Sequence, residues 1–264
     1  MQTRLEQELR GALADESLQV HYQPQISLVD GQVFGVEALA RWRHPRLGEV
    51  EPAVFLELAQ NGGIALAVDA YVQNRALADA AEWHRQGFNV AVSINISPAQ
   101  IKQANFLDDF QQRLQRAEVA PSMVKAELVE TALLDGAADI LNKLQGVKAL
   151  GVELAIDDFG TGYSSLSYLQ QFPIDWLKID KTFVTELKQS GNSVLVDAIL
   201  AMGKGLGMKL IAEGVEHREQ LDYLRNNGCN AVQGFLLAPA LAKDELFTLL
   251  QQTDFSALIA AQTS

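Results

Sequence analysis

The sequence predicts an α/β protein with a modified TIM-like (β/α)8 barrel, in which the first strand runs antiparallel. Two observations lead to this prediction. Eight short segments rich in valine, isoleucine and leucine alternate with stretches of helical periodicity, and eight such units close a barrel. The link SLVDGQ at 27–32, between the first two segments, is too short for a helical crossover and contains Asp30-Gly31, a pair typical of hairpin turns.

The predicted strands are, in order, residues 18–23, 33–40, 90–96, 124–128, 152–157, 174–179, 208–212 and 231–236. Most of the intervening stretches have apolar residues at helical spacing and a glycine at the last turn, as in SVLVDAILAMGKGLG at 193–207. The GKGLG within it resembles a phosphate-binding loop only superficially. Because no strand precedes it, we expect a helix terminus there.

The length and composition predict a single domain over residues 1–264, since one barrel can absorb 264 residues. The amphipathic opening, roughly residues 3–16 within an N-terminal segment 1–17, predicts a helix. This helix is either a lid on the barrel bottom or a remnant of a linker to an upstream domain. The chain has no apolar run long enough to cross a membrane and no apolar signal-peptide core, which predicts a cytoplasmic domain.

The net charge of −12 argues against a polymeric nucleic acid as partner, because such binders usually gather lysine and arginine on one face. A small anionic molecule is compatible with this charge. It would need local cations, either metal ions or a few basic side chains.

Polar side chains lie at the ends of seven predicted strands: Glu37, Asn95, Glu127, Asp157 with Asp158, Lys178, Glu213 and Gln233. In a barrel of parallel strands these ends share one rim, where active sites of this architecture lie. Any one acid at a strand end could simply cap a helix, but capping does not explain the whole set. The set therefore predicts a metal site.

Carboxylate and amide oxygens, without histidine or cysteine, favour magnesium, manganese or calcium over zinc or copper. Because successive strand residues point to opposite sides, we expect Asp157 to face the barrel axis and Asp158 to lean toward a second position beside it. Two neighbouring acids could serve two cations about 3.5 to 4 Å apart, the arrangement that supports phosphodiester hydrolysis.

Two basic residues extend this hypothesis. Period two places Glu37, Leu39 and Arg41 on one strand face, so that Arg41 can pair with a phosphate. A stacked surface pair between Arg41 and Trp42 is an open alternative. Lys178 near metals would be a point charge that orients the attacking oxygen or stabilises developing charge.

Eight ordered motifs extend this pattern: YQP at 22–24, EALARWRHP at 37–45, SINIS at 93–97, ELVET at 127–131, DDFGTGYSSL at 157–166, LKID at 177–180, AEGVE at 212–216 and QGF at 233–235. With these motifs the chain closely resembles the EAL-domain phosphodiesterases, which hydrolyse the bacterial second messenger cyclic di-GMP. The resemblance covers about residues 5–250. It implies a modified barrel with an antiparallel first strand.

The resemblance implies cleavage of cyclic di-GMP to linear pGpG with two Mg²⁺ or Mn²⁺ ions, while Ca²⁺ is expected to bind and inhibit. It implies that the metal ligands are Glu37, Asn95, Glu127, Asp157, Asp158 and Glu213. Among the catalytic residues Glu37, Lys178 and Glu213, it assigns the water-holding role to Lys178. Glu213 would be a general base or a ligand of the second metal.

The resemblance also places further residues. It implies that the substrate-contacting positions are Gln23, Leu39, Arg41, Asp180 and Gln233, the last beside the metal site. It implies that Glu130 and Glu216 position the loop after the fifth predicted strand. A homodimer and an upstream sensory or GGDEF-type domain are further expectations.

One departure from the family pattern keeps an alternative open. The family often has a basic residue shortly after the QG pair, whereas this chain has QGFLLAPAL at 233–241. The chain could therefore be a catalytically weak or inactive receptor for cyclic di-GMP. A different metal-dependent barrel enzyme, acting for instance on an enolisable acid, would also fit the rim carboxylates, but Arg41 and the ordered motifs disfavour it.

Overall fold

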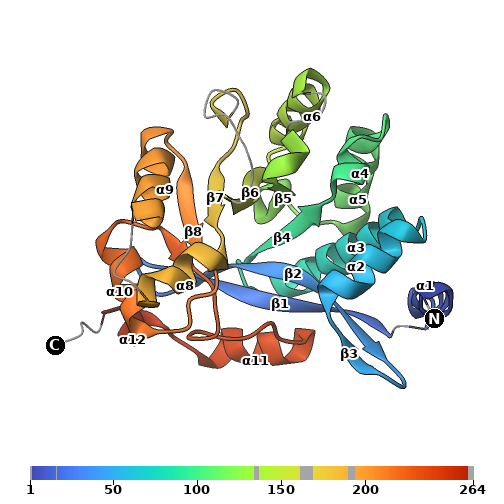
Figure 1. The fold of residues 1–264 in the computed structure, drawn as a ribbon, viewed down its shortest axis with the longest axis horizontal. Helices are drawn as coiled ribbons and strands as arrows, with labels where there is room; N and C mark the ends of the chain where they lie inside the picture. The colour runs from blue at the N-terminus through green and yellow to red at the C-terminus, as the bar shows by residue number, and fades with distance from the viewer. Residues whose placement is uncertain (1, 16, 134–136, 161–168, 190–193, 261–264) are drawn as a thin grey trace.

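Strand pairing closes eight strands into a barrel in the computed structural model. The structure describes residues 2–15, 17–133, 137–160, 169–189 and 194–260, whose helices and strands are drawn in Figure 1. The barrel strands are β1 (Leu18–Ser27), β2 (Val33–His44), β4 (Ala91–Ile96), β5 (Val124–Val129), β6 (Glu153–Phe159), β7 (Trp176–Ile179), β8 (Lys209–Ala212) and β9 (Ala231–Val232). Their order around the barrel is β1-β9-β8-β7-β6-β5-β4-β2, and pairing of β1 with β2 closes it.

The first strand is antiparallel to both of its neighbours, β2 and β9, whereas β2 and β4 to β9 run parallel to one another. This confirms the modified barrel predicted from the short hairpin link. The carboxyl ends of the parallel strands consequently share one rim, and the side chains at those ends come together.

Three strands end four residues away from their predicted ends, and the other strands match within two residues. β1 and β2 are longer than expected, and β2 continues to His44 because a missed strand, β3 (Gly48–Val50), pairs with its end. The last strand was predicted to reach residue 236 but stops at Val232. The chain turns at Gly234, where φ is +157° and an added Cβ would lie 2.2 Å from the Val215 carbonyl oxygen, so only glycine fits.

Helices surround the barrel (Figure 1). They are α2 (Pro52–Asn61), α3 (Ala65–Arg85), α4 (Pro98–Ile101), α5 (Phe106–Ala117), α6 (Ala137–Ala149), α8 (Lys181–Gln189), α9 (Val194–Gly205), α10 (Arg218–Asn226), α11 (Lys243–Gln252) and α12 (Ser256–Ala260), with short 3-10 turns at Pro121–Met123 and Glu130–Leu133. Within the described residues, no helix combines the length and the apolar character that a membrane crossing requires.

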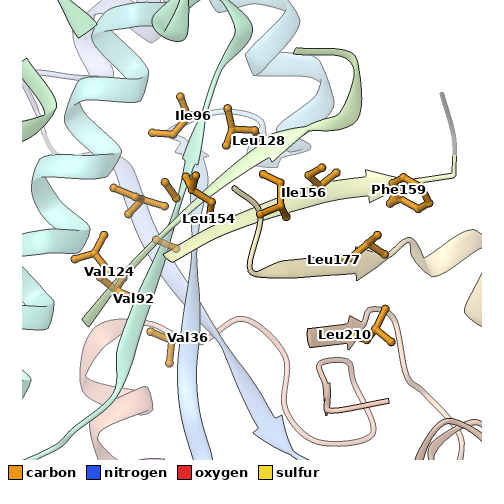
Figure 2. Packing of buried hydrophobic residues seen from close by; sticks show 14 of the residues in the cluster. Val36, Val92, Ile96, Val124, Leu128, Leu154, Ile156, Phe159, Leu177 and Leu210 are labelled. Atoms are coloured by element: carbon orange, nitrogen blue, oxygen red, sulfur yellow. The ribbon is translucent and has the colours of Figure 1, made fainter. Parts of the chain in front are cut away.

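The main hydrophobic core lies between the strands and these helices. Figure 2 shows part of it, including Val124 and Leu128 on β5 and Leu154 and Ile156 on β6. Because side chains alternate along a strand, the positions between Val124 and Leu128 in β5 include inward-facing polar residues. The inner face combines these polar residues with a small apolar cluster of Ala155, Trp176, Ile211 and Ala231. Burial of the apolar outer face thus stabilises strands whose inner face is partly polar.

The opening helix α1 (Gln2–Ala12) packs at the carboxyl end of β2. Its Leu9 and Ala12 are buried in a second small cluster with Trp42 and Phe55, and Glu8 accepts a hydrogen bond from His44 over 3.1 Å. The alternative of a lid on the barrel bottom was therefore wrong, because the carboxyl end of β2 belongs to the opposite rim. The role as a linker stays a prediction.

The glycines at the end of α9 provide a test of the fold. The GKGLG stretch is a helix terminus, as predicted, since α9 ends at Gly205. An added Cβ at Gly203 would lie 2.6 Å from Cδ2 of the buried Leu210, whereas one at Gly205 would contact nothing within 4 Å. We expect Gly205→Ala to stabilise the protein by up to about 1 kcal/mol through helix propensity.

The matched substitution Gly203→Ala should instead destabilise the protein by about 1 to 3 kcal/mol, because overpacking against Leu210 outweighs the propensity gain. Urea denaturation midpoints of the two variants and the parent measure both effects. Equal stabilisation by both substitutions would contradict the packing of α9 on β8.

Candidate metal centre at the carboxyl rim of the barrel

A buried ammonium group lies at the centre of the rim. The Lys178 side chain from β7 has no exposed surface and is surrounded by carboxylates from β2, β5, β6 and the residue after β8. Its Nζ lies 3.1 Å from Glu37, 2.6 Å from Glu127, 3.0 Å from Asp157 and 2.7 Å from Glu213. The structure therefore brings together residues that are up to 176 positions apart in sequence, from Glu37 to Glu213.

The cluster has an excess of negative charge. With Asp158 it contains five carboxylates against one ammonium, a net charge of −4 if all are ionised. Burial raises the pKa of Glu127 to about 7 despite its contact with Lys178, and burial likewise raises the pKa of Asp157 and Glu213. Burial of this excess negative charge is unfavourable unless bound protons or cations neutralise part of it.

Glu37 and Lys178 differ from these three carboxyls, because both keep their charged form despite burial. Burial opposes ionisation of Glu37, but the Lys178 charge and the Gln233 amide outweigh it and hold the pKa of Glu37 below its usual value. Burial also opposes the charge on Lys178, yet the surrounding carboxylates hold its pKa well above the usual value. The surrounding carboxylates therefore favour the charged form of Lys178.

The carboxylate oxygens form two overlapping groups suited to cations. Oxygens of Glu37, Glu127 and Asp157 lie within 4.8 Å of one another, and so do oxygens of Asp157, Asp158 and Glu213. Asp157 belongs to both groups, as expected for neighbouring cations that share a ligand. Asn95 at the end of β4 adds an amide whose nitrogen lies 3.5 Å from Glu37 Oε1.

The donor set fits a hard divalent cation. Oε1 of Glu127 is buried and has no hydrogen-bond partner among the described residues. An unsatisfied buried acceptor is destabilising, and a bound cation would satisfy it. Because the candidate donor atoms are carboxylate and amide oxygens, the site suits magnesium, manganese or calcium rather than zinc or copper.

The adjacent acids Asp157 and Asp158 reach one cluster through a backbone irregularity. The β6–β7 register shifts between Ile156 and Phe159, and Asp158 has φ of +52°, in the left-handed region. Strict alternation would have sent the two side chains to opposite sides, so this turn decides the geometry. Partial burial and the Asp157 charge raise the pKa of Asp158 to about 6.

Gln233 lies against the carboxylates. Its amide nitrogen donates to Glu37 Oε2 over 2.7 Å and to Glu213 Oε1 over 3.0 Å, and the side chain is almost fully buried. It thus links one carboxylate from each cation group. Its assignment as a substrate contact stays a prediction.

Two cavities flank the cluster and share Arg41. One of about 450 Å³ is lined by Leu39, Arg41 and Asn95 and by apolar side chains of α2 and α3. The other, about 260 Å³, is lined by Gln23, Arg41, Glu213 and neighbouring residues. Trp42 instead packs against Phe55 in the small core cluster, so the stacked Arg41–Trp42 alternative is not what the structure adopts.

Three of the cavity-lining residues that had not been predicted carry a charged or aromatic side chain into the site. Asp69 on α3 lines the larger cavity and accepts a hydrogen bond from Ser97 over 2.5 Å, and burial raises its pKa. Lys181 and Phe235 line the smaller one, and Phe235 is 69% exposed. Lys181 and Phe235 could have been predicted from the sequence, because Lys181 directly follows the LKID motif and Phe235 ends the QGF motif. Asp69 lies within a helix and outside every motif, so the sequence did not point to it.

The remaining predicted residues lie at the edge of the site. Asp180 accepts the Thr182 backbone N–H over 2.9 Å at the start of α8. Glu130 accepts the Gly160 backbone N–H over 3.0 Å, directly before residues 161–168, which include Gly162 and lie outside the described residues. Glu216 lines the smaller cavity. The loop-positioning roles of Glu130 and Glu216 stay predictions.

A comparison with known proteins now identifies the family. A family model described as "EAL domain" matches residues 6–240. The chain belongs to the EAL domain family. This EAL domain is 39% identical over 256 residues to "Cyclic di-GMP phosphodiesterase NbdA" of Pseudomonas aeruginosa, covering 96% of this chain and 33% of the relative.

Another relative of this EAL domain is "Bifunctional diguanylate cyclase/cyclic di-GMP phosphodiesterase MucR" of Pseudomonas aeruginosa, 39% identical over 249 residues, 93% of this chain and 36% of the relative. A solved structure described as "PaMucR Phosphodiesterase, c-di-GMP complex" matches with a TM-score of 0.89 and 38% identity, covering 92% of this chain and 99% of that one. The chain spans about a third of the length of the curated relatives it matches.

The raised carboxyl pKa values predict how the stability of the metal-free EAL domain depends on pH. The pKa of Asp158 rises from 3.8 to about 6, and that of Glu127 from 4.5 to about 7. Between the unfolded and folded values the folded state binds more protons. This stabilising contribution is therefore complete at low pH and lost as the pH rises through the folded pKa values.

Urea denaturation with EDTA at pH 5 and pH 8 measures this dependence, and the Asp158→Asn variant is the control. We expect a smaller loss between the two pH values in Asp158→Asn than in the parent, because one of the shifted groups is gone. An identical loss in both proteins would contradict the assigned origin of the Asp158 shift.

Proposed function

We propose that this EAL domain hydrolyses cyclic di-GMP to linear pGpG, using two Mg²⁺ or Mn²⁺ ions. The observation that supports the proposal most is the pair of overlapping carboxylate groups beside Arg41, between two cavities. Relatives named as cyclic di-GMP phosphodiesterases, and a related structure described as a cyclic di-GMP complex, support the same substrate.

The cavities suit a cyclic dinucleotide with two purine bases and two phosphates. Asp69 offers a carboxylate acceptor in the larger cavity, which complements the N–H donors of a guanine edge. Phe235 offers an exposed ring for base stacking in the smaller cavity. Arg41 at the border of both cavities can pair with a phosphate, and Gln23, Leu39 and Asp180 are further proposed contacts.

The residues present fit two cations. Glu37, Asn95, Glu127 and Asp157 would hold one ion, and Asp157, Asp158 and Glu213 the other. When bound, the ions supply Lewis-acid polarisation of the phosphodiester and of the attacking water.

The side chains of the chain provide the remaining chemistry. Lys178, held among Glu37, Glu127 and Glu213, orients the attacking water as a fixed positive point charge. Glu213 accepts the proton of this water, since it is less buried than Glu127 and adjoins the smaller cavity. Glu37 fixes the ammonium of Lys178 in place. Glu130 and Glu216 are proposed to position the neighbouring loop.

A receptor function is the second candidate, and the segment after Gly234 is the observation that favours it. Ala238 and Ala240 stand where the family often has a basic residue, and the Ala238 carbonyl accepts a hydrogen bond from Gln23 over 3.3 Å. Lys181 lines the smaller cavity, as Ala240 does, and provides positive charge there. This charge replaces that of the missing basic residue, so the altered segment is not a reason to reject turnover. We therefore favour catalysis over binding alone.

Purified protein with cyclic di-GMP and Mn²⁺ should release linear pGpG, detected by chromatography. Glu37→Gln, which keeps the side-chain shape but removes a ligand charge, should lower kcat at least about 100-fold, in the range seen for loss of one essential charged group. Tight binding of cyclic di-GMP with no product above the Glu37→Gln background would establish the receptor function instead.

Calcium offers a separate test of the cation site. We expect Ca²⁺ to compete with Mn²⁺ and suppress turnover, because its larger and looser coordination sphere fits the carboxylate groups but not the reacting geometry. Turnover is measured at fixed Mn²⁺ with increasing Ca²⁺, and added Mg²⁺ is the control. Full turnover with Ca²⁺ alone would refute this part of the proposal.

A homodimer and an upstream sensory or GGDEF-type domain are further parts of the proposal. The greater length of the relatives and the diguanylate cyclase activity in the name of MucR support additional domains in such proteins. Single-domain organisation of residues 1–264 and a cytoplasmic location stay predictions.

A further inference from the structure

Polar side chains continue from the metal centre into the barrel interior. Lys125 on β5 and Gln25 on β1 are buried, with 1% and 0% of their surface exposed. Neither residue is in the predicted site. Burial of their polar groups is unfavourable unless hydrogen bonds replace those to water. Period two places Lys125 on the same inward face as Glu127, one step further from the rim.

These side chains form a continuous chain of hydrogen bonds. Lys125 Nζ donates to Gln25 Oε1 over 3.1 Å, and Gln25 Nε2 donates to Gln233 Oε1 over 3.1 Å. Gln233 Nε2 in turn donates to Glu37 Oε2 over 2.7 Å and to Glu213 Oε1 over 3.0 Å. These hydrogen bonds connect Lys125 to one carboxylate from each of the two overlapping carboxylate groups.

The chemistry of the two ends fixes the direction of the chain. An ammonium can only donate, so Gln25 must turn its oxygen toward Lys125 and its nitrogen toward Gln233. The Glu37 carboxylate is paired with the Lys178 ammonium and can only accept, so Gln233 must turn its nitrogen toward Glu37 and thereby toward Glu213. Either amide reversed would place two acceptors or two donors in contact.

The surroundings hold Lys125 and Gln25 in place. The Lys125 ammonium lies 4.3 Å from the ring centre of Trp176 and 5.0 Å from that of Phe34, and these two rings stack on each other. Gly35 leaves room for the Gln25 amide, because an added Cβ there would lie 3.0 Å from Gln25 Oε1.

We propose that Lys125 is a positioning residue for the metal centre: by donating to Gln25, it sets the amide orientation through which Gln233 holds Glu37 and Glu213. Its consequence for turnover rests on the proposed phosphodiesterase function. The expected effect of Lys125 on cation binding does not depend on that function, because Gln233 holds Glu37 and Glu213 in the protein without substrate.

Three variants separate hydrogen-bond donation from charge and packing. Lys125→Met keeps the side-chain length but removes the donor, whereas Lys125→Gln removes the charge but keeps a donor. Lys209→Met is the matched control, because Lys209 also lies over Trp176, at 4.8 Å, but is exposed and outside the chain of hydrogen bonds.

Mn²⁺ affinity by calorimetry without nucleotide, and kcat and KM for cyclic di-GMP, are measured at pH 7. For Lys125→Met we expect about tenfold weaker Mn²⁺ binding and about tenfold lower kcat with KM nearly unchanged, because a buried acceptor loses its donor. Lys125→Gln should recover most of both losses, and Lys209→Met should match the parent.

Two results would overturn the proposal. If Lys125→Met only lowers the thermal midpoint and binds Mn²⁺ like the parent, Lys125 is structural. If Lys125→Gln is as impaired as Lys125→Met, the charge matters and amide orientation does not.

Two safeguards keep the outcome interpretable. If Lys125→Met fails to fold, Gly35→Ala tests the same series of hydrogen bonds, because the added methyl group displaces the Gln25 oxygen. Unchanged Mn²⁺ binding in Gly35→Ala overturns the proposal. If the parent releases no pGpG, the proposed function fails, while the order of Mn²⁺ affinities among the variants still decides the role of Lys125.

Discussion

The ion pairs between the Lys178 ammonium and the carboxylates around it are the interaction on which the rest of the site depends. Removing an ammonium and several carboxylates from water is unfavourable, and the mutual attraction offsets this only where geometry is good. Four carboxylates within 3.1 Å of one nitrogen meet that requirement. The barrel supplies it, because strands ending on a common rim point their side chains at one axis.

The same constraint explains the division of the barrel strands into two faces. Their outward residues form the large apolar cluster against the helices, and this burial stabilises a fold whose interior contains charged and polar side chains beside a small apolar cluster. The interior in turn keeps a negative excess that Lys178 does not neutralise. A folded protein with this excess at its rim binds divalent cations more readily than a neutral rim would, and cation binding and folding stability are thereby coupled.

The site is continuous with the surfaces around it. Arg41 borders both cavities, and Gln233 joins the two carboxylate groups while contacting the interior amide of Gln25. The two cavities, the two carboxylate groups and the polar interior of the barrel therefore share side chains. In the role proposed for Lys125, a change deep in the barrel alters the carboxylates at the rim, since the hydrogen bonds run from one amide to the next.

The sequence by itself determined the antiparallel first strand, through the short link with Asp30-Gly31, and the rim residues, because strand ends of a parallel barrel must meet. Only the tertiary structure decided that a left-handed residue brings Asp158 beside Asp157, that Asp69 on a helix faces the cavity, and that Lys125 contacts Gln25. The physical reason is that periodicity along one segment fixes which way a side chain points. What it meets there depends on segments far away in the chain.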